Sequence, residues 1–241
     1  ILSRITEEHH EGLSVLYICP LRALLNNLHI RLQEYCAMVG LNCGIWHGDV
    51  GPSARYRIKR EQPDILLTTP ESLEVMLISK LGEAREMLKS VRVVVIDEIH
   101  AFAGDDRGWH LLALLERIGV LAGREVQRIG LSATVGNPEQ LLTWMAGHCQ
   151  GTRCVVNPSG NASIADVDVQ LDYVGTTANA ALVISRLHRG EKRLVFCDSR
   201  SRVEELGVEL RRLGVNTYLS HSSLSAEERR SSEEAFAQAQ D

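Results

Sequence analysis

The sequence predicts an α/β protein in which parallel sheets are covered by helices on both faces. Short apolar runs alternate along the chain with longer segments of helical period, which is the pattern of repeated strand–helix–strand units. The run 93–96 is apolar at every position, as expected for a strand that is buried on both faces. With 44% hydrophobic and 24% charged residues, the composition is that of a globular protein, and 241 residues allow one or two domains.

The individual elements follow from these patterns in chain order. Eight strands are predicted, at 13–19, 42–46, 64–68, 91–97, 127–132, 167–174, 193–197 and 215–219. Seven helices are predicted between and after them, near 21–38, 70–80, 107–121, 138–147, 178–189, 200–213 and 225–239. Local signals support two helix starts, because Asn137 and Pro138 give a cap and a first-turn proline, and Ser225 precedes two glutamates. A doubly wound parallel sheet accounts for this order.

A break in the periodicity divides the chain. Near 151–165 the sequence turns to Asn, Pro, Ser and Gly, which is typical of a linker. We therefore expect a first domain at 1–152, a linker with a connecting strand at 153–175, and a second domain at 176–241. Because only two or three strands are predicted in the second domain, its doubly wound sheet is expected to be incomplete.

Composition and charge exclude several classes of protein. No apolar stretch approaches the roughly 18 to 20 residues of a membrane-spanning helix, and the N-terminus lacks a signal-peptide pattern, so we expect a cytoplasmic protein. The net charge is −5, and acidic residues outnumber basic ones in both 1–150 and 151–241, so any nucleic-acid contact must be local. The six cysteines form no C-x-x-C pair, which argues against a zinc site, and a disulfide framework is not expected in a reducing compartment.

Two adjacent carboxylates, Asp97 and Glu98, follow the buried strand within the run V-V-V-I-D-E-I-H. In a doubly wound sheet, ligands bind at the carboxyl ends of the strands. One carboxylate there can hold Mg²⁺, and its neighbour can orient or deprotonate a water for phosphoryl transfer. His100 lies two residues further on and could relay the state of that site. Taken alone, this segment is equally well explained by an acidic turn with a solvated histidine.

Four other polar segments also follow predicted strands. They are P-L-R-A-L (20–24), W-H-G-D (46–49), T-T-P-E-S (68–72) and L-S-A-T (131–134). Hydroxyls and free helix N-terminal amides, as after 68, can contact a phosphate backbone, although a helix cap explains that segment as well. Five such segments at the ends of five strands are hard to explain by packing alone.

The order of these segments resembles the first motor domain of superfamily 2 helicases. The run L-V-F-C-D-S-R (194–200) and the block beginning H-S-S-L-S (221–225) are similar to motifs of the second motor domain. The wording T-T-P-E-S-L-E-V-M-L, D-E-I-H-A-F-A-G and R-G-W-H-L-L is most similar to the large helicase-related (Lhr-like) family of DEAD/DEAH-box helicases. The resemblance covers nearly the whole chain.

This resemblance implies two RecA-like domains and an ATP-dependent helicase or translocase that uses ATP and Mg²⁺. Asp97 would coordinate the magnesium ion and Glu98 would activate the hydrolytic water. His100, Ser132 and Thr134 would contact the nucleotide and couple its state to domain movement. The path of one nucleic-acid strand would be lined by Pro20, Arg22, Gly48, Thr69, Pro70, Ser72, Ser199, Arg200, His221 and Ser222. The expected partner is single-stranded or duplex nucleic acid, with DNA favoured over RNA, although backbone contacts are common to both.

The family also needs a phosphate-binding loop of the form G-x-x-x-x-G-K-[ST], and none of the four lysines lies in such a pattern. The resemblance places that loop before Pro20, with 1–10 at the end of the helix that follows it, and places the last motifs after Asp241. We therefore expect a fragment that hydrolyses ATP poorly by itself. The alternative is a nucleic-acid clamp or remodelling scaffold on the same fold. An unrelated hydrolase or dehydrogenase is disfavoured, because the sequence contains neither G-x-S-x-G nor G-x-G-x-x-G.

Overall fold

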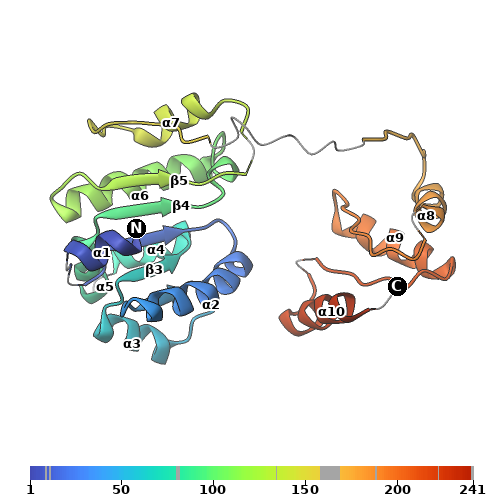
Figure 1. The fold of residues 1–241 in the computed structure, drawn as a ribbon, viewed down its shortest axis with the longest axis horizontal. Helices are drawn as coiled ribbons and strands as arrows, with labels where there is room; N and C mark the ends of the chain where they lie inside the picture. The colour runs from blue at the N-terminus through green and yellow to red at the C-terminus, as the bar shows by residue number, and fades with distance from the viewer. Residues whose placement is uncertain are drawn as a thin grey trace. The chain divides into compact units, whose positions relative to one another are not determined.

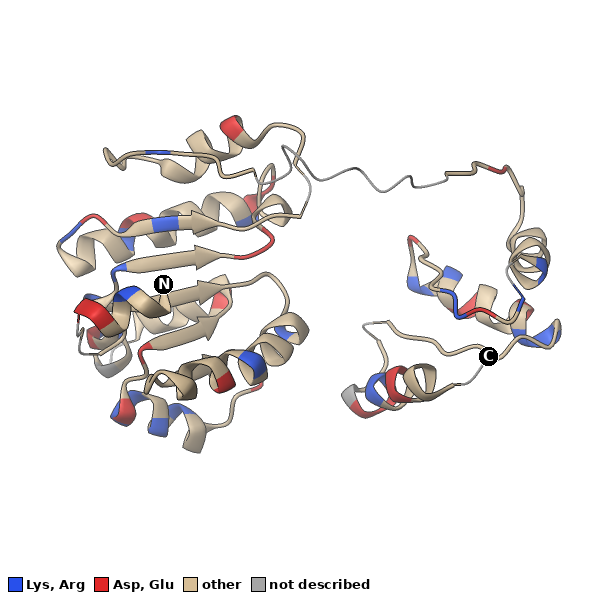
Figure 2. Cartoon of the chain, in the orientation of Figure 1, with Lys and Arg blue, Asp and Glu red and all other residues tan. Residues whose placement is uncertain are grey.

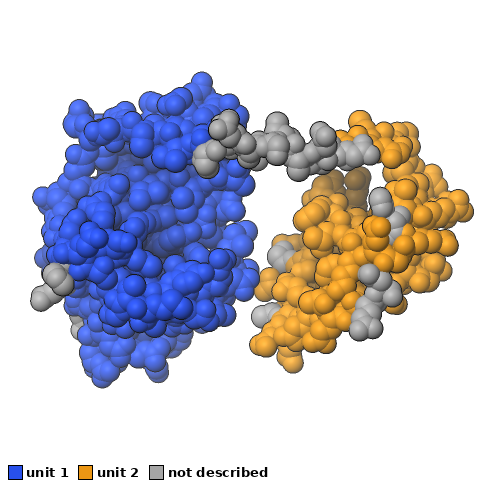
Figure 3. Space-filling model, viewed as in Figure 1, with its two compact units in different colours: residues 1–161 blue, residues 162–241 orange. Residues whose placement is uncertain are grey.

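The chain divides into two compact units, Ile1–Asn161 and Ala162–Asp241, which Figure 1 traces as a ribbon and Figure 3 colours separately. The computed structural model describes residues 1–8, 10, 12–79, 82–133, 135–157, 169–187, 189–221 and 223–239. Two residues with predicted roles, Thr134 and Ser222, lie outside the described residues. Within the described residues, no helix has both the length and the apolar character needed to cross a membrane.

The first unit is built on one five-stranded sheet. Its strands are β1 (Val15–Ile18), β2 (Cys43–Trp46), β3 (Ile65–Thr68), β4 (Val93–Ile96) and β5 (Gln127–Gly130). They are arranged in the order β2-β3-β1-β4-β5, and every neighbouring pair is parallel. The five strands predicted for this part of the sequence are thereby confirmed.

Helices connect these strands. They are α1 (Leu2–Glu8), α2 (Arg22–Met38), α3 (Pro52–Glu61), α4 (Pro70–Ile78), α5 (Glu83–Met87), α6 (Asp106–Ala122) and α7 (Pro138–Ala146), with short 3₁₀ turns η1 (Leu88–Ser90) and η2 (Ile99–Ala101). Neither α3 nor α5 was expected from the sequence. The reason for α3 is that it is highly charged and buries only Ile58, so it has no apolar stripe from which a period could be read.

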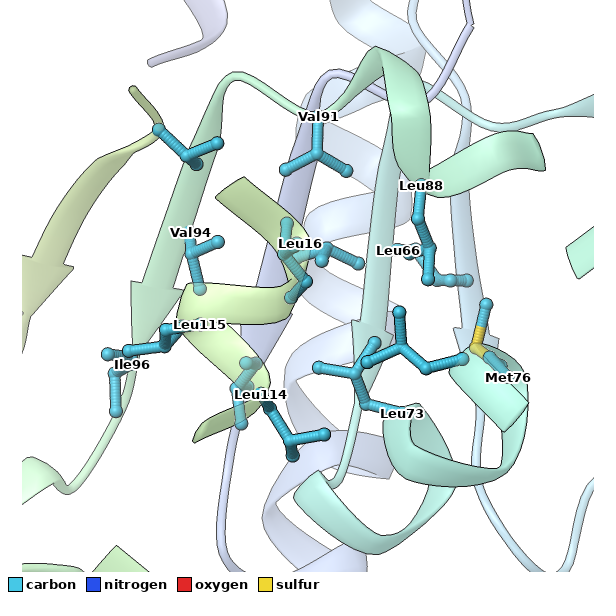
Figure 4. Packing of buried hydrophobic residues seen from close by; sticks show 14 of the residues in the cluster. Leu16, Leu66, Leu73, Met76, Leu88, Val91, Val94, Ile96, Leu114 and Leu115 are labelled. Carbon is cyan, nitrogen blue, oxygen red and sulfur yellow. The ribbon is translucent and has the colours of Figure 1, made fainter. Parts of the chain in front are cut away.

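Alternate residues of β1, β3 and β4 pack on opposite faces of the sheet, which is why these three strands are almost entirely apolar. Leu16, Leu66 and Val94 belong to a core with residues of α4 and α6 (Figure 4). Val15 and Val95 belong to a second core with residues of α1 and α2. Burying a large apolar side chain in this way contributes roughly 1.5–3 kcal/mol. Two cores on one parallel sheet define the doubly wound arrangement that was predicted.

The second unit contains the three predicted helices, α8 (Thr177–Arg186), α9 (Arg200–Arg212) and α10 (Ala226–Gln238). Helices α8 and α9 pack through a small apolar cluster that includes Ala181, Leu206 and Leu210. Helix α10 begins with a reciprocal capping box between Ser225 and Glu228.

The three strands predicted for the second unit are not paired in the part of it that the structure describes. Segments 169–174, 193–197 and 215–219 carry no strand assignment, and Phe196 is 89% exposed. An apolar run becomes a strand only when a neighbouring strand supplies hydrogen-bond partners for its backbone. The apolar pattern was therefore identified correctly, but it does not form a sheet among the described residues.

Candidate functional site

The strand register places the five polar segments at one edge of the sheet. The last residue of β1, Ile18, lies level with Thr68 of β3 and with Ile96 of β4. Trp46 lies level with Thr68, and Gly130 lies level with Ile96. The residues that follow these strand ends therefore emerge side by side. From β2 across to β5, the edge carries the turns that begin at His47, Thr69, Cys19, Asp97 and Leu131.

Asp97 is held in place by two hydrogen bonds to its carboxylate. The Tyr17 hydroxyl donates to Oδ2 over 2.9 Å, and the Glu98 amide donates to Oδ1 over 3.0 Å. Burial, and then the neighbouring Asp97 carboxylate, raise the pKa of Tyr17 above its ordinary value, so the phenol keeps the proton that it donates. Tyr17 was not singled out in the sequence, where its sole distinguishing mark is a hydroxyl within the aliphatic run of β1.

Glu98 has a left-handed backbone conformation, with φ 50° and ψ 43°. Such a conformation costs a non-glycine residue about 1–3 kcal/mol and persists only where the surrounding structure enforces it. The chain then enters η2, and His100 Nδ1 lies 2.8 Å from Ser132 Oγ and 3.5 Å from Glu98 Oε2. The ends of β4 and β5 are thus linked through side chains, and the Glu98 and His100 side chains remain 37% and 44% exposed.

These groups fit a magnesium ion that is bound together with phosphates. Among the described residues, no group of three or more His, Cys, Asp or Glu side chains could hold a metal by itself. Mg²⁺ does not need such a group, because it is commonly held by one or two carboxylates, waters and substrate phosphates. A fixed, oriented Asp97 beside an accessible Glu98 meets that requirement.

Arg22 and Gly48 lie together toward the β2 end of the edge. Arg22 Nη1 donates to Asp49 Oδ1 over 2.9 Å, and both side chains are more than half exposed. A Cβ atom on Gly48 would lie 2.9 Å from Arg22 Nη2. The absence of a side chain at Gly48 therefore makes room for the guanidinium, which is exposed to solvent and able to meet a phosphate.

The turn that contains Gly48 is held by Arg55, which sequence reasoning missed because α3 itself was not predicted. Arg55 Nη2 donates to the carbonyls of His47 and Gly48 over 2.9 and 3.3 Å. Its guanidinium carbon lies 5.6 Å from the centre of the Trp46 ring. On the other side, His47 Nε2 lies 3.0 Å from Asn26 Oδ1, and burial lowers the pKa of this histidine. Contacts on both sides thus fix the turn.

Thr69, Pro70 and Ser72 form the N-terminus of α4. The Ser72 amide donates to Thr69 Oγ1 over 3.4 Å, so the helix-cap alternative considered for this segment is formed. The Thr69 and Pro70 side chains are buried, whereas Ser72 is half-buried. Nucleic-acid contacts at these three residues, and at Pro20, stay predictions.

In the second unit, the predicted residues gather around the N-terminus of α9. Ser199 caps this helix, because its Oγ accepts from the Arg202 amide over 3.3 Å. Arg200 Nη1 donates to Ser223 Oγ over 2.7 Å. His221 Nε2 lies 2.6 Å from Glu204 Oε1 on α9. The structure thus brings Ser199, Arg200 and His221 to one end of α9.

Comparison with known proteins gives a consistent result. The family described as DEAD/DEAH box helicase matches residues 1–141. The chain is 34% identical to the Lhr helicase/uracil glycosylase of Escherichia coli, over 86% of this chain and 16% of that protein. It is 33% identical to the Lhr helicase/probable uracil glycosylase of Mycolicibacterium smegmatis, over 83% of this chain and 14% of that protein. The chain therefore spans about a sixth of the length of these relatives.

Solved structures show the same fold. The chain matches the Mycobacterium smegmatis helicase Lhr bound to ssDNA and AMP-PNP with a TM-score of 0.74 and 34% identity, over 93% of this chain and 32% of that one. The helicase MrfA bound to DNA matches with a TM-score of 0.73 at 21% identity, over 97% of this chain and 35% of that one, a likeness of fold alone. The α/β architecture is therefore that of helicase motor domains.

Proposed function

Because this chain belongs to the DEAD/DEAH box helicase family, we propose that its protein hydrolyses ATP in order to move along or unwind nucleic acid. The observation that carries this proposal is the edge of the sheet, where Asp97 is oriented by Tyr17 and connected through Glu98 and His100 to Ser132. In this proposal, residues 1–152 form the ATP-binding domain and residues 176–241 belong to a second motor domain.

Asp97 and Glu98 have different tasks in the proposed reaction. Asp97 would hold Mg²⁺, which when bound with the nucleotide neutralises charge on its phosphates. Glu98 is accessible and adjacent, so its carboxylate can orient a water and accept its proton as the water attacks. The two neighbouring carboxylates are distinguished by their surroundings, since Asp97 is the one that accepts the Tyr17 hydroxyl.

His100 and Ser132 provide the proposed connection between nucleotide state and movement. Their hydrogen bond joins the turn after β4 to the turn after β5. A change at the Glu98 carboxylate can alter this bond, because the His100 ring lies within 3.5 Å of both groups. The resemblance assigns the same coupling role to Thr134, which lies two residues after Ser132 in the sequence.

The nucleic-acid strand is proposed to bind at the β2-β3-β1 half of the same edge. Acidic and basic residues are interspersed along the helices of both units (Figure 2), and the net charge is −5, so attraction must come from individual side chains. Arg22 is one such side chain, and a phosphate would compete with Asp49 for it. We propose single-stranded DNA as the substrate, on the strength of the similarity to a helicase solved with ssDNA. Ser199, Arg200 and His221 would continue the path on the second unit.

The test is steady-state ATP hydrolysis by the full-length protein, with and without single-stranded DNA or RNA. We expect DNA to stimulate turnover, and Glu98→Gln to reduce it by roughly 10²–10⁴-fold while sparing ATP binding. Glu34→Gln, an exposed change on α2, is the matched control and should leave turnover unchanged. Bound DNA without any turnover would favour the clamp or scaffold instead.

A further inference from the structure

Arg107, in the first turn of α6, contacts three separate parts of the first unit. Its Nε and Nη2 atoms donate to Glu71 Oε1 over 3.2 and 2.8 Å. Nη2 also donates to the Pro20 carbonyl over 3.3 Å. The guanidinium carbon lies 5.5 Å from the centre of the Phe102 ring, which is fully buried.

These three contacts belong to different functional segments. Glu71 is in the first turn of α4, directly after Thr69 and Pro70. Pro20 lies two residues before Arg22, at the start of the turn that follows β1. Phe102 directly follows η2, which begins directly after Glu98. Arg107 therefore joins two segments of the proposed nucleic-acid half of the edge to the segment that follows the paired carboxylates.

The backbone around Arg107 has little freedom to move. Asp105 caps α6, because its Oδ1 accepts from the Gly108 amide over 3.0 Å. A Cβ atom on Gly108 would lie only 2.1 Å from the Phe102 carbonyl oxygen. The segment after η2 thus packs directly on the first turn of α6, so a displacement of Phe102 cannot leave Arg107 where it is.

We propose that Arg107 is a positioning residue that holds the Pro20 turn and the start of α4 at a fixed separation and links both to the D-E-I-H turn. This inference rests on the proposed function. An arginine suits the task, because its planar fork can serve a carboxylate and a carbonyl at once, whereas a lysine offers one point charge.

The positive charge of Arg107 is paired with the Glu71 carboxylate within the protein. Burial of the Glu71 carboxyl favours its neutral form. Hydrogen bonds from the Glu71 backbone amide and from Arg107 outweigh this effect and lower the pKa of Glu71 below its ordinary value. Arg107 therefore affects binding of the nucleic-acid strand through the segments that it holds in place.

Arg107 could instead serve simply as an ion pair between α6 and α4, and a second arginine on the same helix provides the control for that role. Arg117 lies on the same helix and pairs with Glu74, also on α4, over 2.7 Å. The two arginines are equally exposed, at 41% and 42% of the side chain. Arg117→Gln removes a similar pair without touching Pro20 or Phe102.

The experiment compares full-length wild type, Arg107→Gln, Arg107→Lys and Arg117→Gln. ATP hydrolysis is measured while a single-stranded DNA oligonucleotide is titrated, and thermal unfolding is recorded for each protein. For Arg107→Gln we expect the DNA concentration for half-maximal stimulation to rise roughly tenfold, as for one charge-assisted hydrogen bond. Basal hydrolysis without DNA is recorded for each variant, so that a change in the chemical step is separated from a change in the DNA titration. Arg107→Lys should fall between Arg107→Gln and wild type, and Arg117→Gln should match wild type.

Two results would overturn the inference. If Arg107→Gln and Arg117→Gln change the DNA titration and the unfolding midpoint alike, Arg107 is a structural ion pair and the inference fails by itself. If DNA does not stimulate wild-type hydrolysis at all, the proposed function fails and the inference fails with it.

Discussion

Replacing Tyr17 by Phe tests whether Asp97 owes its position to the strand beside it. The substitution removes one hydroxyl and keeps the ring, so the packing of β1 against α1 and α2 is retained. What is lost is the 2.9 Å hydrogen bond to Asp97 Oδ2, which leaves the Glu98 amide as the donor to this carboxylate.

The size of the effect follows from the charge on the acceptor. A hydrogen bond to a charged group is worth about 1.5–3 kcal/mol, which converts to roughly 10- to 150-fold in an equilibrium constant. Groups that orient a metal ligand are typically worth about 10- to 100-fold in metal affinity or activity. We therefore expect Tyr17→Phe to raise the Mg²⁺ concentration for half-maximal ATP hydrolysis by about 10- to 100-fold.

The assay is a Mg²⁺ titration of ATP hydrolysis by the full-length protein, together with the shift in unfolding temperature that Mg²⁺ and ATP produce. Because the pKa of Tyr17 is raised above its ordinary value, the ratio of wild type to variant should be constant from about pH 7 to about pH 9. Tyr35→Phe, at a half-exposed residue of α2, is the control. An unchanged Mg²⁺ requirement in Tyr17→Phe would refute the reasoning.

Two further predictions concern stability, measured by urea unfolding. Gly108→Ala should destabilise the first unit by about 1–3 kcal/mol, because the new methyl group would clash with the Phe102 carbonyl oxygen. Gly119→Ala in the same helix should stabilise it by up to about 1 kcal/mol, because the nearest atom to the new methyl group is 3.9 Å away and alanine favours the helix. Equal effects would contradict this. Hydrogen bonds from Arg117 lower the pKa of Glu74 below 4.5 in the folded state, so its contribution is present above that pH and is lost as the pH falls through the folded pKa. Glu74→Gln should therefore cost up to about 1 kcal/mol at neutral pH and nothing in strong acid; a loss independent of pH would rule this out.

The sheet of the first unit could be predicted because strands buried on both faces have uninterrupted runs of apolar residues. Each of β1, β3 and β4 is flanked by helical segments and is apolar at consecutive positions. The same logic located the polar segments, since residues after parallel strands share an edge. The register then supplied what a pattern cannot, namely that Ile18 stands between Thr68 and Ile96.

Side chains that act across long sequence separations could not be predicted. Tyr17 and Asp97 are 80 residues apart, and Arg107 and Pro20 are 87 apart. Nothing in the local sequence of Arg107 indicates a partner, because the run R-G-W-H-L-L stands out by its resemblance to the Lhr-like family alone. Arg55 was missed for a different reason, because the charged helix that carries it has no hydrophobic period.

The position of β1 suits an edge that serves the two ligands proposed above, ATP with Mg²⁺ and nucleic acid. This strand is the last one of the proposed nucleic-acid half of the edge, and it pairs directly with β4, the strand that Asp97 follows. Its Tyr17 bonds to Asp97 on one side, and three residues later the Pro20 carbonyl accepts from Arg107. A slip of one residue would turn every side chain of β1 to the opposite face and bring the Tyr17 hydroxyl into the core that holds Leu16. An unpaired buried hydroxyl is costly, so the packing that excludes this slip also fixes Asp97 and the Pro20 turn relative to each other. The hydrophobic core thereby sets the geometry that the proposed coupling between ATP and nucleic acid requires.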